Sequence, residues 1–249
     1  MNNSKISIIT VVYNREDLIA QAVMSVQSQD YPFIEHVIID GASNDRTVQV
    51  IKSLIRDEDI LVSEPDKGIY DALNKGIRYS SGGVIGVLHS DDFFADQSVI
   101  SEVVKIFENP SVDIVYGDLD YVSKSDSTKT IRHWIAGQFS KDKLSWGWMP
   151  PHPTIFIRRS VIDDYGTYDT SYRISGDYDA ILRYFSRGDI QSAYIERVLI
   201  KMRVGGQSNR SLNHLLIKMR EDYRALRCYK VGGICALFWK SLSKAHQFF

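Results

Sequence analysis

Residues 84–92 read Val-Ile-Gly-Val-Leu-His-Ser-Asp-Asp, an apolar run that leads directly into two acidic residues. A short apolar run of this kind is typical of a strand that is buried on both faces of a sheet. Two adjacent carboxylates at the end of such a strand repel each other and cost stability unless a cation lies beside them. The stretch therefore predicts a buried strand that ends in two candidate metal ligands, Asp91 and Asp92. The alternative is a solvated turn before a helix.

The same alternation of strand and helix extends on both sides of this stretch. Strands separated by helices of 10–15 residues predict right-handed βαβ units, and hence an α/β fold with a mostly parallel sheet flanked by helices. In such sheets, ligands bind beyond the carboxyl ends of the strands. The expected strands cover residues 6–12, 36–39, 60–62, 84–88 and 112–116, and the expected helices cover 19–26, 46–56, 69–79 and 96–108.

The pattern changes after Asp118. Residues 118–160 are richer in Trp, Pro and Gly, and helical periodicity returns at 176–187 and 211–229. With no internal repeat and no low-complexity linker, we expect one domain over residues 1–208. Its first half would span 1–117 and its second half 118–208. A C-terminal helical extension would occupy 209–249.

Polar residues also follow the other predicted strands. The first strand runs into Thr10-Val11-Val12-Tyr13-Asn14, and the second into Asp40-Gly41-Ala42-Ser43-Asn44-Asp45. An Asp in this position can hydrogen-bond a base or a ribose hydroxyl, although a turn or a helix cap would explain it alone. Asp66 and Lys67 precede a further helix, whose N-terminus favours anions. The alternative for that loop is a well-capped helix.

A last acidic site precedes the helix expected at 176–187. Asp177 follows Ser175-Gly176, and one carboxylate can act as general base on a sugar hydroxyl. Capping of that helix is the alternative role. Upstream, Trp148 and His152 lie in a segment rich in Trp and Pro. Aromatic rings pack well on sugar faces, whereas core packing is the alternative for each Trp.

Together these segments resemble the family 2 glycosyltransferases, which have the Rossmann-like GT-A fold. The resemblance covers residues 5 to about 208 and looks closest to bacterial enzymes that build exopolysaccharide, O-antigen or capsule repeat units. Those enzymes share the Gly-Ile-Tyr-Asp-Ala loop and a late Gly-Gly-x-Ser, here residues 205–208. The matching segments, in chain order, are 9–14, 40–45, 66–74, 90–92 and 176–179.

The resemblance implies an inverting transfer of one sugar, with a single base and an in-line displacement. The donor would be a UDP- or GDP-sugar, and the acceptor a glycan or a lipid-linked sugar. The implied roles are donor binding by Thr10, Tyr13, Asn14, Asp40, Asp66, Lys67 and Asp91; Mn²⁺ or Mg²⁺ binding by Asp91 and Asp92; acceptor binding by Trp148 and His152; and proton abstraction by Asp177.

Two positions depart from the family pattern. Many members have Glu where Gly176 stands, and many have a further Asp where His89 stands, so metal binding would depend more on Asp92. The Gln-x-x-Arg-Trp motif of processive synthases does not follow Asp177, which favours transfer of a single sugar.

Charge is distributed unevenly along the chain. Residues 201–249 carry ten Lys or Arg and two acidic residues, a net charge of +8, so the total of −1 leaves −9 for residues 1–200. The basic residues of 218–249 alternate with aromatic ones, which suits an anionic membrane surface. A helix packed on the domain or a dimer contact is the alternative. We expect no nucleic-acid binding, because the rest of the chain is acidic.

Features that the sequence lacks indicate where the protein is located and argue against other enzyme classes. We expect a cytoplasmic protein, peripheral at the inner face of the cell membrane if the tail binds lipid, because the sequence has no secretion signal, no run approaching ~20 apolar residues and only two cysteines. A sugar-nucleotide pyrophosphorylase or a dehydrogenase would carry a Gly-rich loop after the first strand, and residues 10–15 contain no glycine. A non-catalytic nucleotide-sugar binding module would be expected to lose Asp92 or Asp177.

Overall fold

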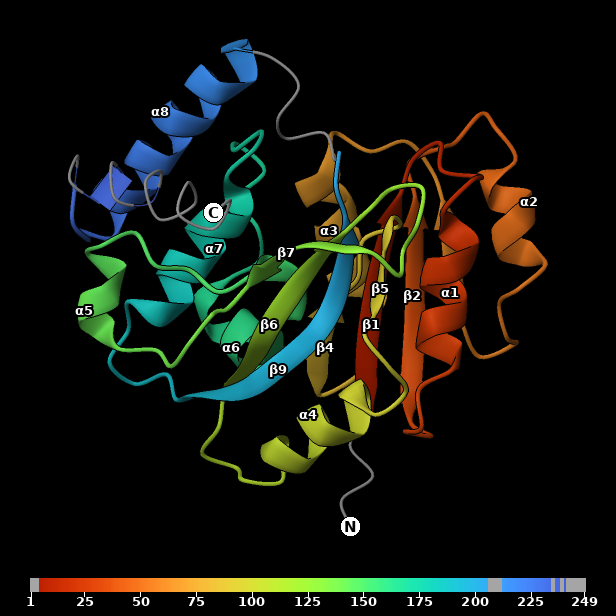
Figure 1. The fold of residues 1–249 in the computed structure, drawn as a ribbon, viewed down its shortest axis with the longest axis horizontal. Helices are drawn as coiled ribbons and strands as arrows, with labels where there is room; N and C mark the ends of the chain where they lie inside the picture. Colours follow the sequence, from red (N-terminus) through yellow and green to blue (C-terminus); the bar gives the residue numbers. More distant parts are fainter. Residues whose placement is uncertain (1–4, 206–211, 234–235, 238–239, 241–249) are drawn as a thin grey trace.

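The computed structural model describes residues 5–205, 212–233, 236–237 and 240. The chain folds around one sheet with helices on both faces (Figure 1). The strands are β1 (Ile6–Val12), β2 (Ile34–Asp40), β3 (Ile60–Ser63), β4 (Val84–Val87), β5 (Asp92–Phe94), β6 (Ile114–Val122), β7 (Thr130–Trp134), β8 (Phe156–Arg158) and β9 (Ser192–Arg203). The helices are α1 (Ile19–Gln27), α2 (Thr47–Lys52), α3 (Ile69–Tyr79), α4 (Val99–Phe107), α5 (Lys141–Leu144), α6 (Arg159–Tyr165), α7 (Gly176–Phe185) and α8 (Leu212–Cys228), with a 3₁₀ turn η1 (His152–Thr154).

The nine strands that the described residues form are ordered β3-β2-β1-β4-β8-β6-β9-β5, and β7 pairs with β6. β1 is parallel to β2 and β4, and β2 is parallel to β3. β8 is antiparallel to both β4 and β6, and β6 is parallel to β9. β5 and β7 are antiparallel to their neighbours. Six of the nine strands thus run the same way, which confirms the expected mostly parallel sheet.

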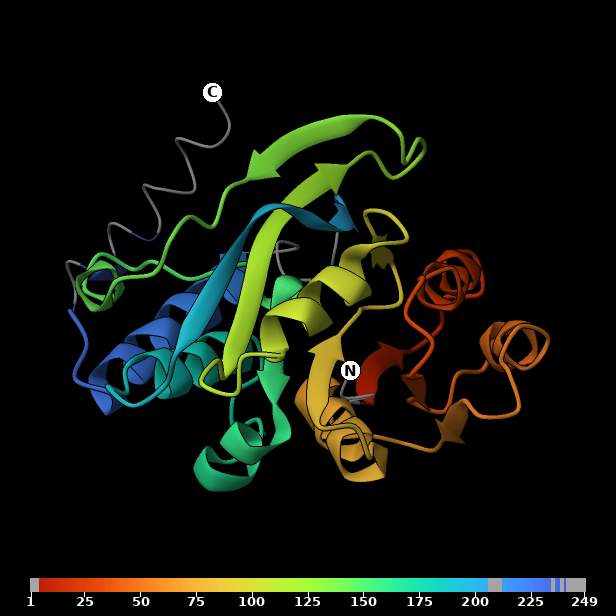
Figure 2. The same ribbon diagram turned by 90° about the horizontal axis from the view of Figure 1, so that it is seen from below.

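Each face of the sheet has its own hydrophobic core, and β1 contributes to both. Ile9 and Val11 pack with residues of α3 and α7, whereas Ile6 and Ile8 pack with residues of α1 and α4. Figure 2 shows the helices on opposite sides of the strands. A strand buried on both faces must be apolar throughout, which explains the continuous apolar runs in the sequence.

The expected elements are present, but the sheet is larger than predicted. The strand expected at 112–116 continues to Val122 as β6, so the division expected after residue 117 falls inside a strand. β9 was not predicted, because its residues are mostly half-buried and include charged ones such as Glu196 and Lys201. β5 begins at Asp92 itself, directly after the paired acidic residues.

The described part of the C-terminal extension packs on the domain. Ala225 and Leu226 of α8 are buried in the core that contains α7. Farther along, the buried Lys240 pairs with Asp222 at 2.8 Å, and its Nζ lies 3.1 Å from the centre of the Tyr178 ring. These contacts favour the packing alternative for this part of the tail. No helix in the described part of the chain is long and apolar enough to cross a membrane.

Several tail residues singled out in the sequence lie outside the described residues. They include Ser208 of the late Gly-Gly-x-Ser segment and the tail aromatics Phe238, Trp239, Phe248 and Phe249.

A buried carboxylate ties the amino ends of β1 and β2 together, far along the strands from the polar loops. Glu35 accepts hydrogen bonds from Ser7 at 2.6 Å, from the Ser81 hydroxyl at 2.6 Å and from Lys5 at 3.1 Å. Burial alone would raise the pKa of Glu35, but these hydrogen bonds lower the pKa to about 2. The ionised carboxylate therefore stabilises the fold.

Glu35→Gln should lower the free energy of unfolding at pH 7 by on the order of 3 kcal/mol, as expected for a pKa reduced from 4.5 to about 2. Because the folded pKa is depressed, this stability is present above pH 4.5 and is lost as the pH falls towards 2. Urea unfolding at pH 7 and pH 3.5 should show the gap between variant and wild type narrowing at the lower pH. The exposed Glu58→Gln serves as control, and an unchanged gap would contradict the assignment.

Candidate functional site

The loops that follow β1 and β2 are cross-linked to each other by their own side chains. The Asn14 amide donates to the Ser43 hydroxyl at 2.8 Å, and the Asn44 amide donates to the Asn14 side chain at 3.0 Å. Asn14 and Ala42 both have positive φ, 50° and 61°, which non-glycine residues seldom adopt. Strained backbone of this kind persists only where surrounding contacts hold it, and it clusters at functional sites.

The Asp40 carboxylate holds the loop after β2 in place by hydrogen bonds. Its carboxylate accepts the Ser43 amide at 3.0 Å, the Ser63 hydroxyl at 2.6 Å and the Ser43 hydroxyl. The residue is 0% exposed. A carboxylate has about four acceptor positions, so one remains for a ligand. The nucleobase contact expected of Asp40 stays a prediction that depends on this last position.

Gly41, which has no side chain, lies between Tyr13 and Asp66. A Cβ added at Gly41 would collide with the Asp66 carboxylate and would come within 3.5 Å of the Tyr13 ring. Tyr13 is 53% exposed, so it offers an open aromatic face beside a carboxylate. A planar heterocycle fits such a face by stacking, while the carboxylate can accept its N–H groups.

The loop that carries Asp66 and Lys67 is held by buried Lys75. Its ammonium donates to the Pro65 carbonyl at 2.7 Å and lies 2.8 Å from Glu64. The Lys67 amide is bonded to Asp71 at 3.0 Å, and its side chain is exposed. Contact between Lys67 and a donor stays a prediction.

Thr10 does not belong to the exposed part of this site. Its hydroxyl lies 2.9 Å from Nε2 of His36, and both residues are 0% exposed. The prediction that the Thr10 side chain contacts a donor is therefore corrected. The residue falls within β1, where every side chain is buried.

Asp92 is the most unusual carboxylate of the described residues. It is 1% exposed, and neither of its oxygens has a hydrogen-bond partner. Burial and the neighbouring Asp91 raise its pKa well above the usual value, and Arg203 opposes that rise only in part. A buried carboxylate without partners is costly, and a cation beside it would remove the cost.

This environment fits a divalent metal ion. The described residues contain no cluster of three or more His, Cys, Asp or Glu that could hold a metal. Mg²⁺ and Mn²⁺ are commonly held by one or two carboxylates together with substrate phosphates, so a closed protein cage is not required. Asp92, with Asp91 beside it, would supply the protein's ligands.

Arg203 is a site residue that sequence reasoning missed. From the end of β9, its guanidinium donates to the Asp91 carbonyl at 2.7 Å and to the Gln21 side chain. It is 7% exposed, so a fixed positive charge lies against the acidic pair. Such a charge stabilises negative charge that develops during a reaction. No sequence spacing links Arg203 to Asp91, because the two meet only through the pairing of β5 with β9.

Asp177 lies at the start of α7 and is anchored by Tyr70 of α3. Its Oδ1 accepts the Tyr178 amide at 2.8 Å and lies 3.4 Å from the Tyr70 hydroxyl. Tyr70 also donates to the Ile174 carbonyl at 2.6 Å. A Cβ at Gly176 would come within 2.8–3.0 Å of the Tyr70 ring. The glycine that departs from the family pattern is therefore required by the tyrosine packed against it.

Two histidines that interact electrostatically with Asp177 are kept neutral by burial. Burial lowers the pKa of His152 to about 4, although Asp177 opposes this. Burial also lowers the pKa of His89, against the charges of Asp91 and Asp177. The two rings are 5.9 Å apart, and His152 Nε2 lies 2.7 Å from the Tyr168 hydroxyl. At neutral pH both histidines are therefore uncharged.

Glu221 of α8 is a second residue that the sequence did not reveal. Its carboxylate accepts the amides of residues 173, 174 and 175 at 2.9, 2.8 and 2.9 Å. These three residues lead directly into Gly176-Asp177. The helix that the sequence suggested as a membrane element therefore holds the segment that presents Asp177.

Trp148 lies among core aromatics. Its indole N–H donates to the Ala136 carbonyl at 2.7 Å, and its ring packs on Tyr116, Phe139 and Phe185 with centroids 5.2–5.8 Å away. This environment favours core packing over the acceptor contact expected for Trp148.

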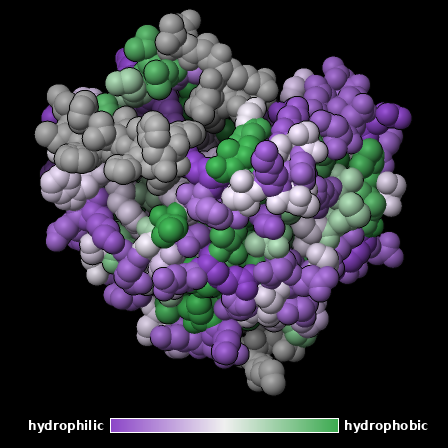
Figure 3. Space-filling view, in the orientation of Figure 1, coloured by the Kyte–Doolittle hydropathy of each residue, from purple (hydrophilic) through white to green (hydrophobic). Residues whose placement is uncertain are grey.

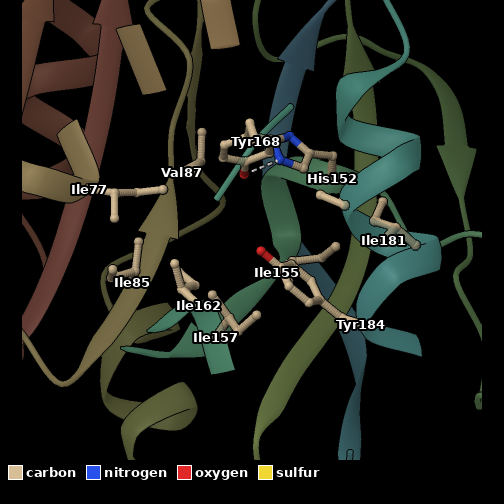
Figure 4. Close-up of a pocket in the computed structure, with 11 residues that line it drawn as sticks. Ile77, Ile85, Val87, His152, Ile155, Ile157, Ile162, Tyr168, Ile181 and Tyr184 are labelled. Atoms are coloured by element: carbon tan, nitrogen blue, oxygen red, sulfur yellow. Dashed lines mark hydrogen bonds between the residues drawn. The ribbon is translucent and has the colours of Figure 1, made fainter. Parts of the chain in front are cut away.

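An apolar cavity of about 30 Å³ lies behind His152 (Figure 4). Its walls are mainly isoleucines, and the hydrogen-bonded pair of His152 and Tyr168 closes one end. The volume suffices for about one water molecule, far less than a sugar occupies. The cavity is a packing void that contributes to the dry surroundings of His152.

Gly176→Ala should destabilise the fold by about 1–3 kcal/mol, because the added methyl would strike the Tyr70 ring. Gly188→Ala is the matched control, since a Cβ there meets nothing within 4 Å. Urea unfolding of both variants measures the difference. A Gly176→Ala variant as stable as the control would show that the contact is not restrictive.

Asp92→Asn should stabilise the metal-free protein by about 1 kcal/mol, which is a few degrees in the unfolding midpoint. The raised pKa of Asp92 means that ionisation costs stability as the pH rises, so the gain should be larger at pH 8 than at pH 5. Thermal unfolding in EDTA checks this, with exposed Glu58→Gln as control. A destabilised variant at pH 8 would refute the view that the carboxylate lacks partners.

The chain matches known proteins in sequence and in fold. It is 31% identical over 186 residues to an uncharacterized glycosyltransferase of Mycobacterium tuberculosis, covering 72% of this chain and 68% of that protein. It is 28% identical over 217 residues to a PGL/p-HBAD biosynthesis glycosyltransferase of Mycobacterium bovis, covering 85% and 82%.

Two solved structures share the fold at low sequence identity. The mannosyltransferase PcManGT of Pyrobaculum calidifontis, in complex with GDP-Man and Mn²⁺, has a TM-score of 0.65 at 18% identity, covering 98% of this chain and 74% of that one. S. aureus TarS 1–349 with UDP-GlcNAc has a TM-score of 0.66 at 14% identity, covering 90% and 65%. The α/β GT-A-like fold is thereby confirmed.

The family described as "Glycosyl transferase family 2" matches residues 7–166, which is 160 of the 249 residues. That segment contains the loops after β1 and β2, the Asp66 loop and the acidic pair. The chain belongs to glycosyltransferase family 2 and is a glycosyltransferase.

Proposed function

We propose that this glycosyltransferase moves one sugar from a nucleotide-diphosphate sugar to an acceptor hydroxyl by a single displacement that inverts the anomeric centre. One observation carries the proposal. Asp177 is a half-buried carboxylate that interacts electrostatically with two neutral histidines, His89 and His152, and the charge of Asp91 acts on the same His89. One base facing a donor site is what a single displacement requires.

The donor side supports a UDP- or GDP-sugar. Tyr13 and Asp66 offer a face and an acceptor for the base, and Asp91 and Asp92 lie where the diphosphate would meet Mn²⁺ or Mg²⁺. When bound, the metal would offset charge on the departing diphosphate. Arg203 adds a fixed positive charge on the same side. The structures with UDP-GlcNAc and with GDP-Man and Mn²⁺ make both nucleotides reasonable first choices.

We assign the acceptor to the glycans and lipid-linked sugars of bacterial surface structures. The curated relative named for PGL/p-HBAD biosynthesis supports a glycolipid-like acceptor, and the resemblance to exopolysaccharide, O-antigen and capsule enzymes supports the wider class. Figure 3 shows that the face seen in Figure 1 is mainly hydrophilic, with small hydrophobic patches between polar residues. Sugars, which have both polar edges and apolar faces, suit a surface of that kind.

A peripheral membrane contact through α8 is part of the proposal. Leu215, Leu216 and Met219 are 52%, 65% and 42% exposed, and Lys218 and Arg220 lie on the same helix. Exposed apolar residues flanked by basic ones suit the inner face of a membrane that carries anionic lipids.

Thermal unfolding with UDP, GDP, UDP-GlcNAc and GDP-Man, each with and without Mn²⁺, tests the donor side. A ligand that binds only the folded state raises the unfolding midpoint. We expect metal-dependent stabilisation by one nucleotide and loss of that effect in Asp92→Ala. A folded protein that none of these ligands stabilises would contradict the assigned donor site.

Asp177→Asn should lower transfer by about 10²–10⁴-fold while leaving nucleotide binding within a few-fold of wild type. The amide keeps the shape of the side chain but cannot accept the proton. Release of nucleoside diphosphate in the presence of acceptor measures transfer, and exposed Asp163→Asn is the control. Near-normal turnover in Asp177→Asn would rule this residue out as the base.

A further inference from the structure

Four residues from four different strands form one lateral row across the sheet. Arg132 of β7 pairs with Tyr121 of β6, Tyr121 pairs with Met202 of β9, and Met202 pairs with Asp92 of β5. Laterally paired residues in a sheet have their side chains on the same face. The side chains of Arg132 and Tyr121 therefore lie on the face that carries the Asp92 carboxylate.

The next row on that face is apolar and supports the first. It joins Trp134, Leu119, Ile200 and Phe94. Leu119 and Ile200 are 0% exposed and Phe94 is 4% exposed. Trp134 stands at the end of this row, beside Arg132, and the buried residues of the row hold it in place.

Arg132 is stacked on two aromatic rings. Its guanidinium carbon lies 4.7 Å from the centre of the Tyr121 ring and 5.9 Å from that of Trp134. The two rings are 6.4 Å apart and parallel within 3°. A guanidinium is planar, and its N–H groups match the geometry of phosphate and carboxylate oxygens. Contact with two aromatic rings limits the positions that the group can take.

Tyr121 connects this stack to the reaction centre. Burial raises the pKa of Tyr121, Arg132 opposes this, and the charges of Asp92 and Asp177 add to the rise. In the lateral row, Tyr121 lies two strands away from the candidate metal ligand Asp92. With strands ~4.8 Å apart, three strand spacings place the Arg132 backbone roughly 14 Å from that of Asp92.

We propose that Arg132, held by Tyr121 and Trp134, binds a phosphate group of the acceptor, at a distance from the hydroxyl that is glycosylated. The inference rests on the proposed function, because only a transferase has an acceptor. It identifies the class of acceptor as a sugar linked to phosphate. The hydroxyl would lie near Asp177, and the phosphate would meet the guanidinium at the outer end of the row.

The test uses glucose 1-phosphate as probe and methyl α-glucoside as its uncharged counterpart. Binding is measured by calorimetry or ligand-observed NMR on the full chain, in EDTA so that no metal recruits phosphate to Asp92. The variants are Arg132→Gln and, as matched control on the same hairpin, the exposed Lys129→Gln. Thermal unfolding verifies that both variants are folded.

Wild type and Lys129→Gln should bind glucose 1-phosphate at least fivefold more tightly than methyl α-glucoside. Arg132→Gln should bind the two sugars equally, because only the ionic contact is removed. Equal binding of both sugars by wild type, or an undiminished preference in Arg132→Gln, would overturn the proposal. Failure of the nucleotide screen would instead count against the proposed function, so the two failures are distinguishable.

Discussion

The contact between Tyr70 and the start of α7 joins the two sides of the site. Tyr70 stands in the first turn of α3, directly after the loop that holds Asp66. Its ring occupies the space over Gly176 and stacks on Tyr168 at 5.8 Å, and its hydroxyl bonds the Ile174 carbonyl. Because Tyr168 in turn bonds His152, one aromatic side chain fixes the donor loop, the proposed base and the buried histidine relative to one another.

The electrostatics of the site arise mainly from burial. Asp92 has lost water without gaining a hydrogen bond, whereas Asp40, equally buried, is satisfied by three donors. The two carboxylates thus do different work. Asp40 holds a loop in place and is stable without a ligand. Burial of the Asp92 carboxylate costs free energy, and a bound cation can remove that cost. His152 is neutral for the same reason, because burial lowers its pKa to about 4.

Sequence reasoning predicted what is local and missed what is not. The strands β1 to β4 and helices α1 to α4 follow from periodicity and loop length, and the acidic residues were located correctly at strand ends. β5 and β9 were missed, because Asp92 pairs with Met202, 110 positions away, and neither segment alternates cleanly. Arg203 and Glu221 depend on such distant pairings as well. Thr10 was misassigned because a polar residue inside a buried strand can be satisfied by a neighbour, here His36.

The segment that matches the family as a whole ends at residue 166, but residues of the candidate site lie beyond it. Asp177 lies beyond that limit. Glu221, whose carboxylate accepts the amides of residues 173–175 just before Asp177, lies on α8, still farther along the chain. The proposed donor-binding loops and the proposed base thus lie in consecutive stretches of the chain. A protein shortened to the shared segment would keep the loops around Tyr13 and Asp66 and lose both the proposed base and its clamp. For the same reason, trimming α8 as a presumed membrane anchor would also loosen residues 173–175, so a loss of activity would not by itself report on lipid binding.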